Sequence, residues 1–204
     1  MRRGLFKIFS YIFHPILMPL IGILIILSIS HLTLLPIASK KAILSLVAII
    51  TVFFPLTIIP ILYYQKLITG ITISNRRERL LPMFLTSIFY YFGYFMLHKY
   101  SAPVFLQEYM LVVFISVLTA SVINIKWKIS LHMIGIGGLI GLLSALAFLF
   151  GIHNSIVFMI SIIVAGIIGT SRLYLSEHTS TQIYSGFLLG YILNFGVIVM
   201  FNII

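Results

Sequence analysis

The sequence predicts an all-α integral membrane protein, a polytopic bundle of six or seven transmembrane helices. Hydrophobic residues occupy 61% of the 204 positions and charged residues only 8%, with a mean hydropathy of +1.21. A soluble domain does not need so much apolar surface. Apolar runs of about 20 residues, the length of a helix that crosses a bilayer, recur along the chain. Because these runs leave little sequence for a soluble part, we expect residues 1–204 to form a single membrane domain.

Short polar segments, prolines and glycines separate the predicted spans. Their approximate ranges are 5–30, 42–64, 81–97, 105–123, a fifth from about 130, then 154–170 and 183–201. The first span contains His14-Pro15 and Pro19. Proline removes a backbone hydrogen bond and bends a membrane helix, so we expect a kinked or partly re-entrant first helix. We favour this structural explanation over a chemical role for His14.

Small residues indicate where helices pack closely. In the fifth span Gly137 and Gly141 are four residues apart, so they lie on one face of a helix. Gly186 and Gly190 have the same spacing in the last span. Such faces let two membrane helices approach closely. The sixth span offers a further small-residue face, made of Ala165, Gly166 and Gly169.

The composition of charged residues and of cysteine limits which partners and cofactors we expect. The formal net charge is +10, and the cations lie in short loops between spans. This favours anionic lipid headgroups or a phosphorylated substrate over nucleic acid. The absence of cysteine excludes disulfides and thiol chemistry. With three Glu and no Asp, the chain is poor in the oxygen ligands that Mg²⁺ or Ca²⁺ needs, and cations beside the histidines oppose zinc. We therefore expect no metal and no cofactor.

Three polar islands interrupt the apolar sequence. The first is Asn75 to Pro82, the second Lys126 to His132, and the third Ser171 to Gln182. Charged residues are costly inside a bilayer, so they often mark a site. Two spans separate the first island from the second, and two more separate the second from the third. All three islands are therefore expected on the same membrane face, where they can converge.

If they converge, the islands combine cations, a hydroxyl group and two imidazoles. The residues are Arg76, Arg77, Arg79, Lys128, Ser130, His132, Arg172 and His178. Arginine binds phosphate oxygens through paired hydrogen bonds, and histidine supplies a nucleophile and acid–base chemistry near neutral pH. The set favours metal-independent phosphoryl transfer.

Each island also has a purely structural explanation. Arg76 to Arg79 is typical of a positive loop at the cytoplasmic face, and Lys126 and Lys128 around Trp127 are typical interfacial anchors. Arg172 and His178 can extend to the interface from a helix end. The agreement of the three islands in order and in membrane face favours a common site.

The islands resemble the motifs of the type 2 phosphatidic acid phosphatase superfamily, which includes the vanadium haloperoxidases. The third motif of that family is Ser-Arg, five residues, His, three residues and Asp, and Ser171 to His178 follows it. Lys128 to His132 is similar to the second motif, Pro-Ser-Gly-His. Asn75 to Pro82 resembles a remnant of the first, a Lys followed seven residues later by Arg-Pro. The resemblance covers about residues 76–190, within a phosphatase-like core of about 66–204.

The resemblance implies a helical bundle with a lipid substrate and a role for each matching residue. His178 would be the nucleophile that forms a phosphohistidine, and His132 the general acid for the leaving group. The phosphate-binding residues would be Arg172, Ser130 and the first-motif arginine, for which Arg79 is the first choice and Arg76 or Arg77 the alternatives. The convergence of the islands, rather than the resemblance, adds Lys128 to the expected phosphate-binding residues.

The departures from the family pattern concern all three motifs. The Asp that orients the nucleophile is Gln182 in this chain. Four residues on in a helix, Gln182 would lie beside His178, where its carbonyl can fix the imidazole tautomer without stabilising an imidazolium. By analogy with Asp→Asn in a serine-protease triad, the rate loss could reach ~10⁴. The first-motif Lys is absent, and Ile129 and Leu131 replace the Pro and Gly of the second.

We therefore expect a lipid-phosphate phosphatase, acting on a monoester or diphosphate in a bacterial inner membrane. By resemblance the substrates would be phosphatidic acid, phosphatidylglycerophosphate, a polyprenyl diphosphate or a lipid A phosphate. The alternative is a catalytically weakened relative that binds anionic lipid or serves as a scaffold subunit. A small transporter ranks third, since it would need polar helices at the midplane in matched halves. The side of the membrane that carries the site stays open.

Overall fold

The computed structural model describes residues 2–29, 31–70, 73 and 75–203, and within these ranges it contains helices and no strand. Seven helical segments are long and apolar enough to cross a membrane: Phe6–Ser28, Ile37–Tyr64, Leu80–Lys99, Val104–Lys126, Leu131–Phe150, Ser155–Tyr174 and Ser180–Ile203. The predicted all-α membrane architecture is confirmed at this level, with the larger of the two expected numbers of spans. Ser30, the predicted end of the first span, lies outside the described residues.

Several spans consist of more than one helical element. The α-helices are α1 (Arg2–Ile12), α2 (Met18–Ile29), α3 (Ile37–Ala48), α4 (Phe54–Tyr64), α5 (Leu80–Lys99), α6 (Val104–Lys126), α7 (Leu131–Phe150), α8 (Ser155–Tyr174), α9 (Ser180–Ile192) and α10 (Ile198–Ile203). Two 3₁₀ turns, η1 (Pro15–Leu17) and η2 (His31–Leu34), flank α2. Two π-helical turns, η3 (Ile49–Phe53) and η4 (Leu193–Val197), join α3 to α4 and α9 to α10.

The chain divides into two compact units. Unit 1 combines Met1–Leu34 with Ile129–Ile204, and unit 2 is Leu35–Lys128. Unit 1 therefore brings the N-terminal segment together with the last three spans. The two units are described separately, so the expected single domain stays a prediction.

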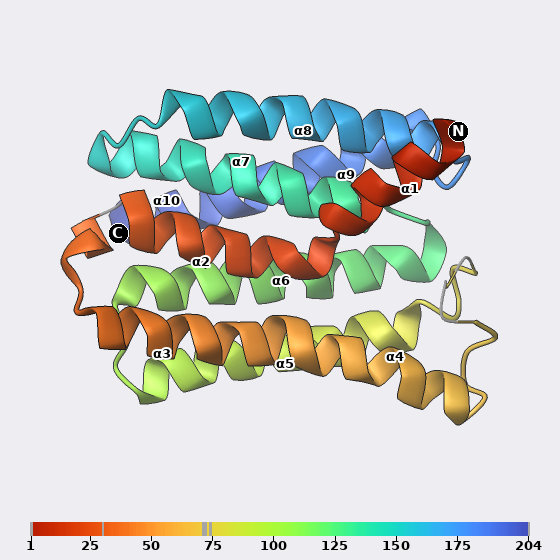
Figure 1. Ribbon diagram of the computed structural model, residues 1–204, viewed down its shortest axis with the longest axis horizontal. Helices are drawn as coiled ribbons and strands as arrows, with labels where there is room; N and C mark the ends of the chain where they lie inside the picture. The colour runs from red at the N-terminus through yellow and green to blue at the C-terminus, as the bar shows by residue number, and fades with distance from the viewer. Residues whose placement is uncertain (1, 30, 71–72, 74, 204) are drawn as a thin grey trace. The chain divides into compact units, whose positions relative to one another are not determined.

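Helix α7 forms the centre of unit 1, where it contacts α2, α8 and α9 (Figure 1). A Cβ atom on Gly137 would collide with the carbonyl oxygen of Phe187, and one on Gly190 would collide with that of Ile134. The small-residue faces predicted in the fifth and last spans thus pack against each other. The face predicted in the sixth span is wrong at Gly166, where a Cβ atom would meet open space.

The first span bends where its prolines predict a bend. Helix α1 ends at Ile12, and His14 has the extended backbone of an N-cap (φ −64°, ψ 137°) before Pro15 begins η1. The Nδ1 atom of His14 accepts a hydrogen bond from the Ile16 amide at 3.3 Å. This contact gives His14 a structural role, as expected. Helix α1 then packs on α8, where the rings of Phe6 and Tyr174 lie 4.6 Å apart.

Candidate functional site

The third polar island begins where a tight turn ends helix α8. The Ser176 amide donates to the Leu173 carbonyl at 2.9 Å, and the Glu177 amide donates to the Arg172 carbonyl at 3.1 Å. Ser176 has the left-handed backbone (φ 55°) that this pair of bonds requires. The pattern is a Schellman motif. It reverses the chain and returns Glu177 toward Arg172.

Helix α9 begins three residues later with a capping box. The Thr179 hydroxyl accepts from the Gln182 amide at 3.4 Å, and the Gln182 side-chain oxygen accepts from the Thr179 amide at 3.2 Å. The two bonds satisfy amide groups that a helix start otherwise leaves unpaired. His178 therefore lies between two defined helix ends, and only 7% of its surface is exposed.

Gln182 contacts His178 as predicted. Its Oε1 atom lies 3.0 Å from the Nδ1 atom of His178. Since the same oxygen accepts from the Thr179 amide, it is the carbonyl oxygen of the side chain, and Nδ1 must be the donor. In the neutral imidazole, Nδ1 then carries the proton and Nε2 carries the lone pair. The geometry fits a ring whose Nε2 acts as a nucleophile.

Arg172 is almost entirely buried at the end of α8, with 8% of its surface exposed. Its Nη1 atom donates to the Ser10 hydroxyl at 3.4 Å, and its Nη2 atom forms an ion pair with Glu177 at 3.5 Å. Its Nε atom is buried and has no hydrogen-bond partner. The predicted phosphate-binding arginine is thus held at both ends of its guanidinium group and unsatisfied at the third nitrogen.

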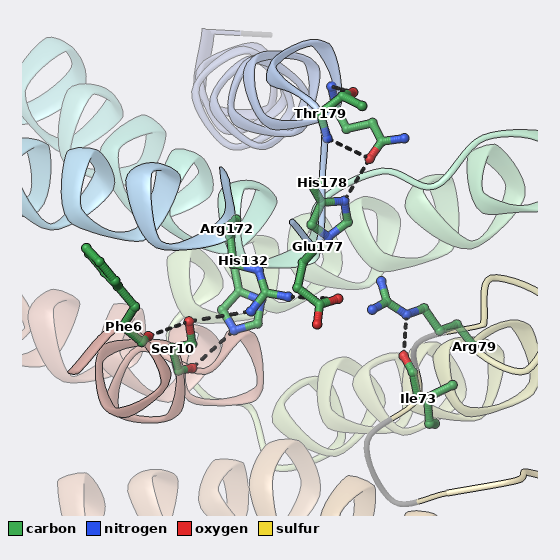
Figure 2. Close-up of polar contacts among 10 residues, drawn as sticks. Phe6, Ser10, Ile73, Arg79, His132, Arg172, Glu177, His178 and Thr179 are labelled. Atoms are coloured by element: carbon green, nitrogen blue, oxygen red, sulfur yellow. Dashed lines mark hydrogen bonds and ion pairs between the residues drawn. The ribbon is translucent and has the colours of Figure 1, made fainter. Parts of the chain in front are cut away.

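Ser10 on α1 joins the second and third islands. Its carbonyl oxygen lies 3.1 Å from the Nε2 atom of His132, at the start of α7. Figure 2 shows His132 and Arg172 both reaching Ser10. Ser10 is not predicted from the sequence, because its partners lie 122 and 162 residues away. The available signal was its position one helical turn after Lys7, as a polar residue within an apolar stretch.

Ser130 carries the second unsatisfied group. It is the N-cap of α7, but its hydroxyl makes no capping bond, has no partner and is fully buried. A Cβ atom on Gly186 would lie 2.8 Å from the Ser130 carbonyl oxygen, so α9 packs directly on this residue. A buried polar group without a partner costs about 1–3 kcal/mol. Because Arg172 Nε and the Ser130 hydroxyl are both hydrogen-bond donors, the ligand that would satisfy them is an acceptor such as phosphate.

The first polar island belongs to unit 2. Two of its arginines make contacts within that unit: Arg79 Nε donates to the Ile73 carbonyl at 2.8 Å, and the backbone carbonyl of Arg76 accepts from the Asn124 side chain at 3.0 Å. Lys128 also falls within unit 2. The predicted meeting of Arg76, Arg79 and Lys128 with the two histidines therefore stays a prediction.

Glu78 fixes the loop that precedes α5. Its carboxylate accepts from the Thr69 amide at 2.8 Å, from the Thr69 hydroxyl and from the Asn75 side chain. These bonds, the Thr69 amide foremost, hold the pKa of the Glu78 carboxyl below its usual value. Glu78 thus orders its own loop. Among the residues that the structure describes, no three His, Cys, Asp or Glu side chains are grouped so that they could hold a metal ion.

No family model, curated protein or solved structure matches the chain. The resemblance to the phosphatase family thus depends on the motifs alone.

Proposed function

We propose that the chain is a bacterial inner-membrane phosphatase that hydrolyses a phosphate monoester or diphosphate on a lipid, without a metal, through a phosphohistidine on His178. One observation supports this most directly. Arg172 Nε and the Ser130 hydroxyl are buried and unsatisfied, and they belong to the two residues that the family resemblance assigns to phosphate oxygens. A bound phosphoryl group would satisfy both donors.

The proposed reaction has two displacements. The Nε2 lone pair of His178 attacks phosphorus, and the bond between phosphorus and the lipid oxygen breaks with its electron pair on oxygen. His132 gives that oxygen a proton, which releases the lipid alcohol or monophosphate. Water then attacks the phosphohistidine while His132 takes its proton. The N–P bond breaks, the electron pair returns to His178, and inorganic phosphate leaves. Arg172 and Ser130 would stabilise the equatorial oxygens in both steps.

Gln182 would make this a slow enzyme. When His178 is phosphorylated its ring becomes cationic, and a carboxylate beside Nδ1 would stabilise that charge. The neutral Gln182 carbonyl keeps the hydrogen bond, 3.0 Å from Nδ1, and therefore preserves the tautomer. It does not supply the charge.

An apolar hollow in unit 1 supports a lipid substrate. It has a volume of about 180 Å³ and lies between α2, α7 and α8, with Phe13, Ile21, Ile136 and Val164 in its lining. Ile136 follows His132 by four residues on α7, which is one turn or about 6 Å along the helix axis. A hydrocarbon chain in the hollow would have its headgroup end within one helical turn of His132.

The second candidate is a protein that binds anionic lipid without hydrolysing it. It is favoured by the ion pair between Arg172 and Glu177, which already offsets part of the positive charge, and by the neutral Gln182. The two candidates share the anion site and differ in whether His178 becomes phosphorylated.

The deciding experiment measures phosphate release by detergent-purified protein, with EDTA, from phosphatidic acid, phosphatidylglycerophosphate, a polyprenyl diphosphate and lipid A phosphate. The variant is His178→Ala, and the matched control is His153→Ala, since His153 is exposed between α7 and α8. We expect release by wild type and His153→Ala, and none by His178→Ala. No release by wild type from any of these lipids would favour the lipid-binding candidate.

A further inference from the structure

We propose that Ser10 is a positioning residue of the phosphoryl-transfer site, so that the N-terminal helix α1 is part of the site. The inference rests on the proposed function and adds a segment that the three polar islands do not include. Ser10 has two polar groups, and each contacts a different residue of the proposed reaction: the carbonyl contacts His132, and the hydroxyl contacts Arg172.

The Ser10 carbonyl selects the nitrogen of His132 that exchanges protons. A carbonyl oxygen only accepts hydrogen bonds, so the Nε2 atom of His132, 3.1 Å away, must carry a hydrogen. Nδ1 is then the nitrogen that gives and takes the proton of the leaving group. The contact parallels that between Gln182 and His178, where an amide oxygen fixes the opposite nitrogen. Each imidazole of the site is therefore oriented by an amide carbonyl.

The Ser10 hydroxyl orients the guanidinium of Arg172. Its single hydrogen is directed to the Phe6 carbonyl at 3.0 Å, so its lone pairs are available to Nη1 of Arg172. Glu177 holds Nη2. Because the guanidinium is planar, two contacts at its terminal nitrogens fix its plane. The nitrogen left for a phosphate oxygen is Nε, the one without a partner.

The packing of α1 on α8 buries Ser10 and leaves its neighbours exposed. Ser10 is 8% exposed, whereas Tyr11 is 68% and Ile12 55% exposed. The ring of His14, at the bend after α1, meets the ring of His132 edge to face at 5.5 Å. Together with the contact between Phe6 and Tyr174, these contacts hold both ends of the Ser10 turn. The position of the Ser10 carbonyl thus depends on an intact α1.

Two substitutions distinguish the effect of the Ser10 hydroxyl from that of the Ser10 carbonyl. Ser10→Ala removes the hydroxyl and keeps the carbonyl. We expect the KM for phosphatidic acid in mixed detergent micelles to rise about ten- to a hundredfold, the usual effect of losing a hydrogen bond to a charged group, with the pH profile of kcat unchanged. The matched control is Tyr11→Ala, because the neighbouring Tyr11 side chain is exposed. Thermal unfolding of both variants checks that they fold equally.

Ser10→Pro displaces the carbonyl as well, because the proline ring would clash with the carbonyl of Phe6, four residues earlier, and break α1. We expect kcat to fall and its pH profile to shift, since the proton-exchanging nitrogen of His132 is no longer fixed. The matched control is Gly4→Pro, in the first turn of α1, where proline is tolerated. The inference is overturned if Ser10→Ala behaves like Tyr11→Ala, or if it hydrolyses phosphatidic acid faster than wild type, as expected of a residue that blocks the site.

A second measurement tests the role of Ser10 without depending on hydrolysis. In protein labelled with ¹⁵N-histidine, the nitrogen chemical shifts of His132, assigned by His132→Gln, report its tautomer. We expect a hydrogen on Nε2 in wild type, Ser10→Ala and Gly4→Pro, and mixed tautomers in Ser10→Pro. Identical His132 signals in wild type and Ser10→Pro would overturn the role of Ser10. Absence of hydrolysis by wild type with the expected tautomer change would overturn the proposed function alone.

Discussion

The first and third polar islands use arginine in opposite ways. The first has three arginines within four positions: Arg77 is exposed, the backbone carbonyl of Arg76 accepts from the Asn124 side chain, and Arg79 Nε donates to the Ile73 carbonyl. The third has a single arginine, Arg172, which is buried, contacts a helix from the other end of the chain and keeps one nitrogen unsatisfied. We therefore expect the dense charge of the first island to mark a membrane face, and the unsatisfied buried donor of the third to mark a place for a ligand.

The largest expected effect tests this difference directly. Arg172→Ala should lower kcat/KM for the hydrolysed lipid about 10²–10³-fold, the range observed when one charge-stabilising donor is removed from an active site. Arg77→Ala should change it less than threefold, because that side chain is exposed and interchangeable with other surface cations. The measurement is steady-state phosphate release. Equal losses in the two variants would erase the distinction between the islands.

Gln182→Glu tests whether the third island lacks a carboxylate beside His178. Glutamate keeps the side-chain length and the capping box, and it places a carboxylate beside Nδ1 of His178. We expect turnover to rise about ten- to a hundredfold, less than the ~10⁴ limit because Gln182 already holds the tautomer. Gln182→Leu, which loses the acceptor, should lower turnover. A Gln182→Glu variant no faster than wild type would show that charge beside His178 does not limit the reaction.

A packing substitution tests the close contact between α7 and α9 at Ser130. In Gly186→Ala the new Cβ atom would lie 2.8 Å from the Ser130 carbonyl, and overpacking of this kind costs about 1–3 kcal/mol. Gly166→Ala is the matched control, because its Cβ atom would meet open space. Thermal unfolding in detergent should show a lower midpoint for Gly186→Ala and an unchanged or slightly higher midpoint for Gly166→Ala. The opposite order would contradict the observed helix contact.

The smallest expected effect concerns the loop of the first island. Since the folded pKa of Glu78 lies below its ordinary value of 4.5, its bonds stabilise the loop above that pH, and the stabilisation is lost as the pH falls through the folded pKa. Hydrogen exchange of the Thr69 amide, corrected for intrinsic rate, should accelerate in that interval. Glu78→Gln should show no such pH dependence.

Sequence patterns that act over a few residues were sufficient to predict much of the fold. The seven spans, the bend near His14 and the matching faces at Gly137 and Gly190 follow from hydropathy, proline and glycine spacing, all of which act within a few residues. The contact between His178 and Gln182 was predicted from a helical spacing of four, and the contact is present but this reason is wrong. His178 lies before the N-cap of α9, and the Gln182 side chain reaches it by folding back in the capping box.

Contacts between distant segments could not be predicted in this way. Ser10 is an unremarkable residue of a short helix, and its role depends on how α1 packs on α8. The ion pair between Glu177 and Arg172 does not follow from helical spacing either, because a Schellman motif returns Glu177 to the end of α8. The unsatisfied state of Ser130 depends on the burial of its hydroxyl by α9, which no local spacing specifies.

The separation of Ser10 from Arg172 also has a consequence for biosynthesis. The two residues are 162 positions apart, and ribosomes add about 5–20 residues per second. Helix α1 therefore waits on the order of ten seconds or more in the nascent protein before α8 has been made. During that time the first span has no α8 to pack on, so the contact between Ser10 and Arg172 forms only after the sixth span has been synthesised.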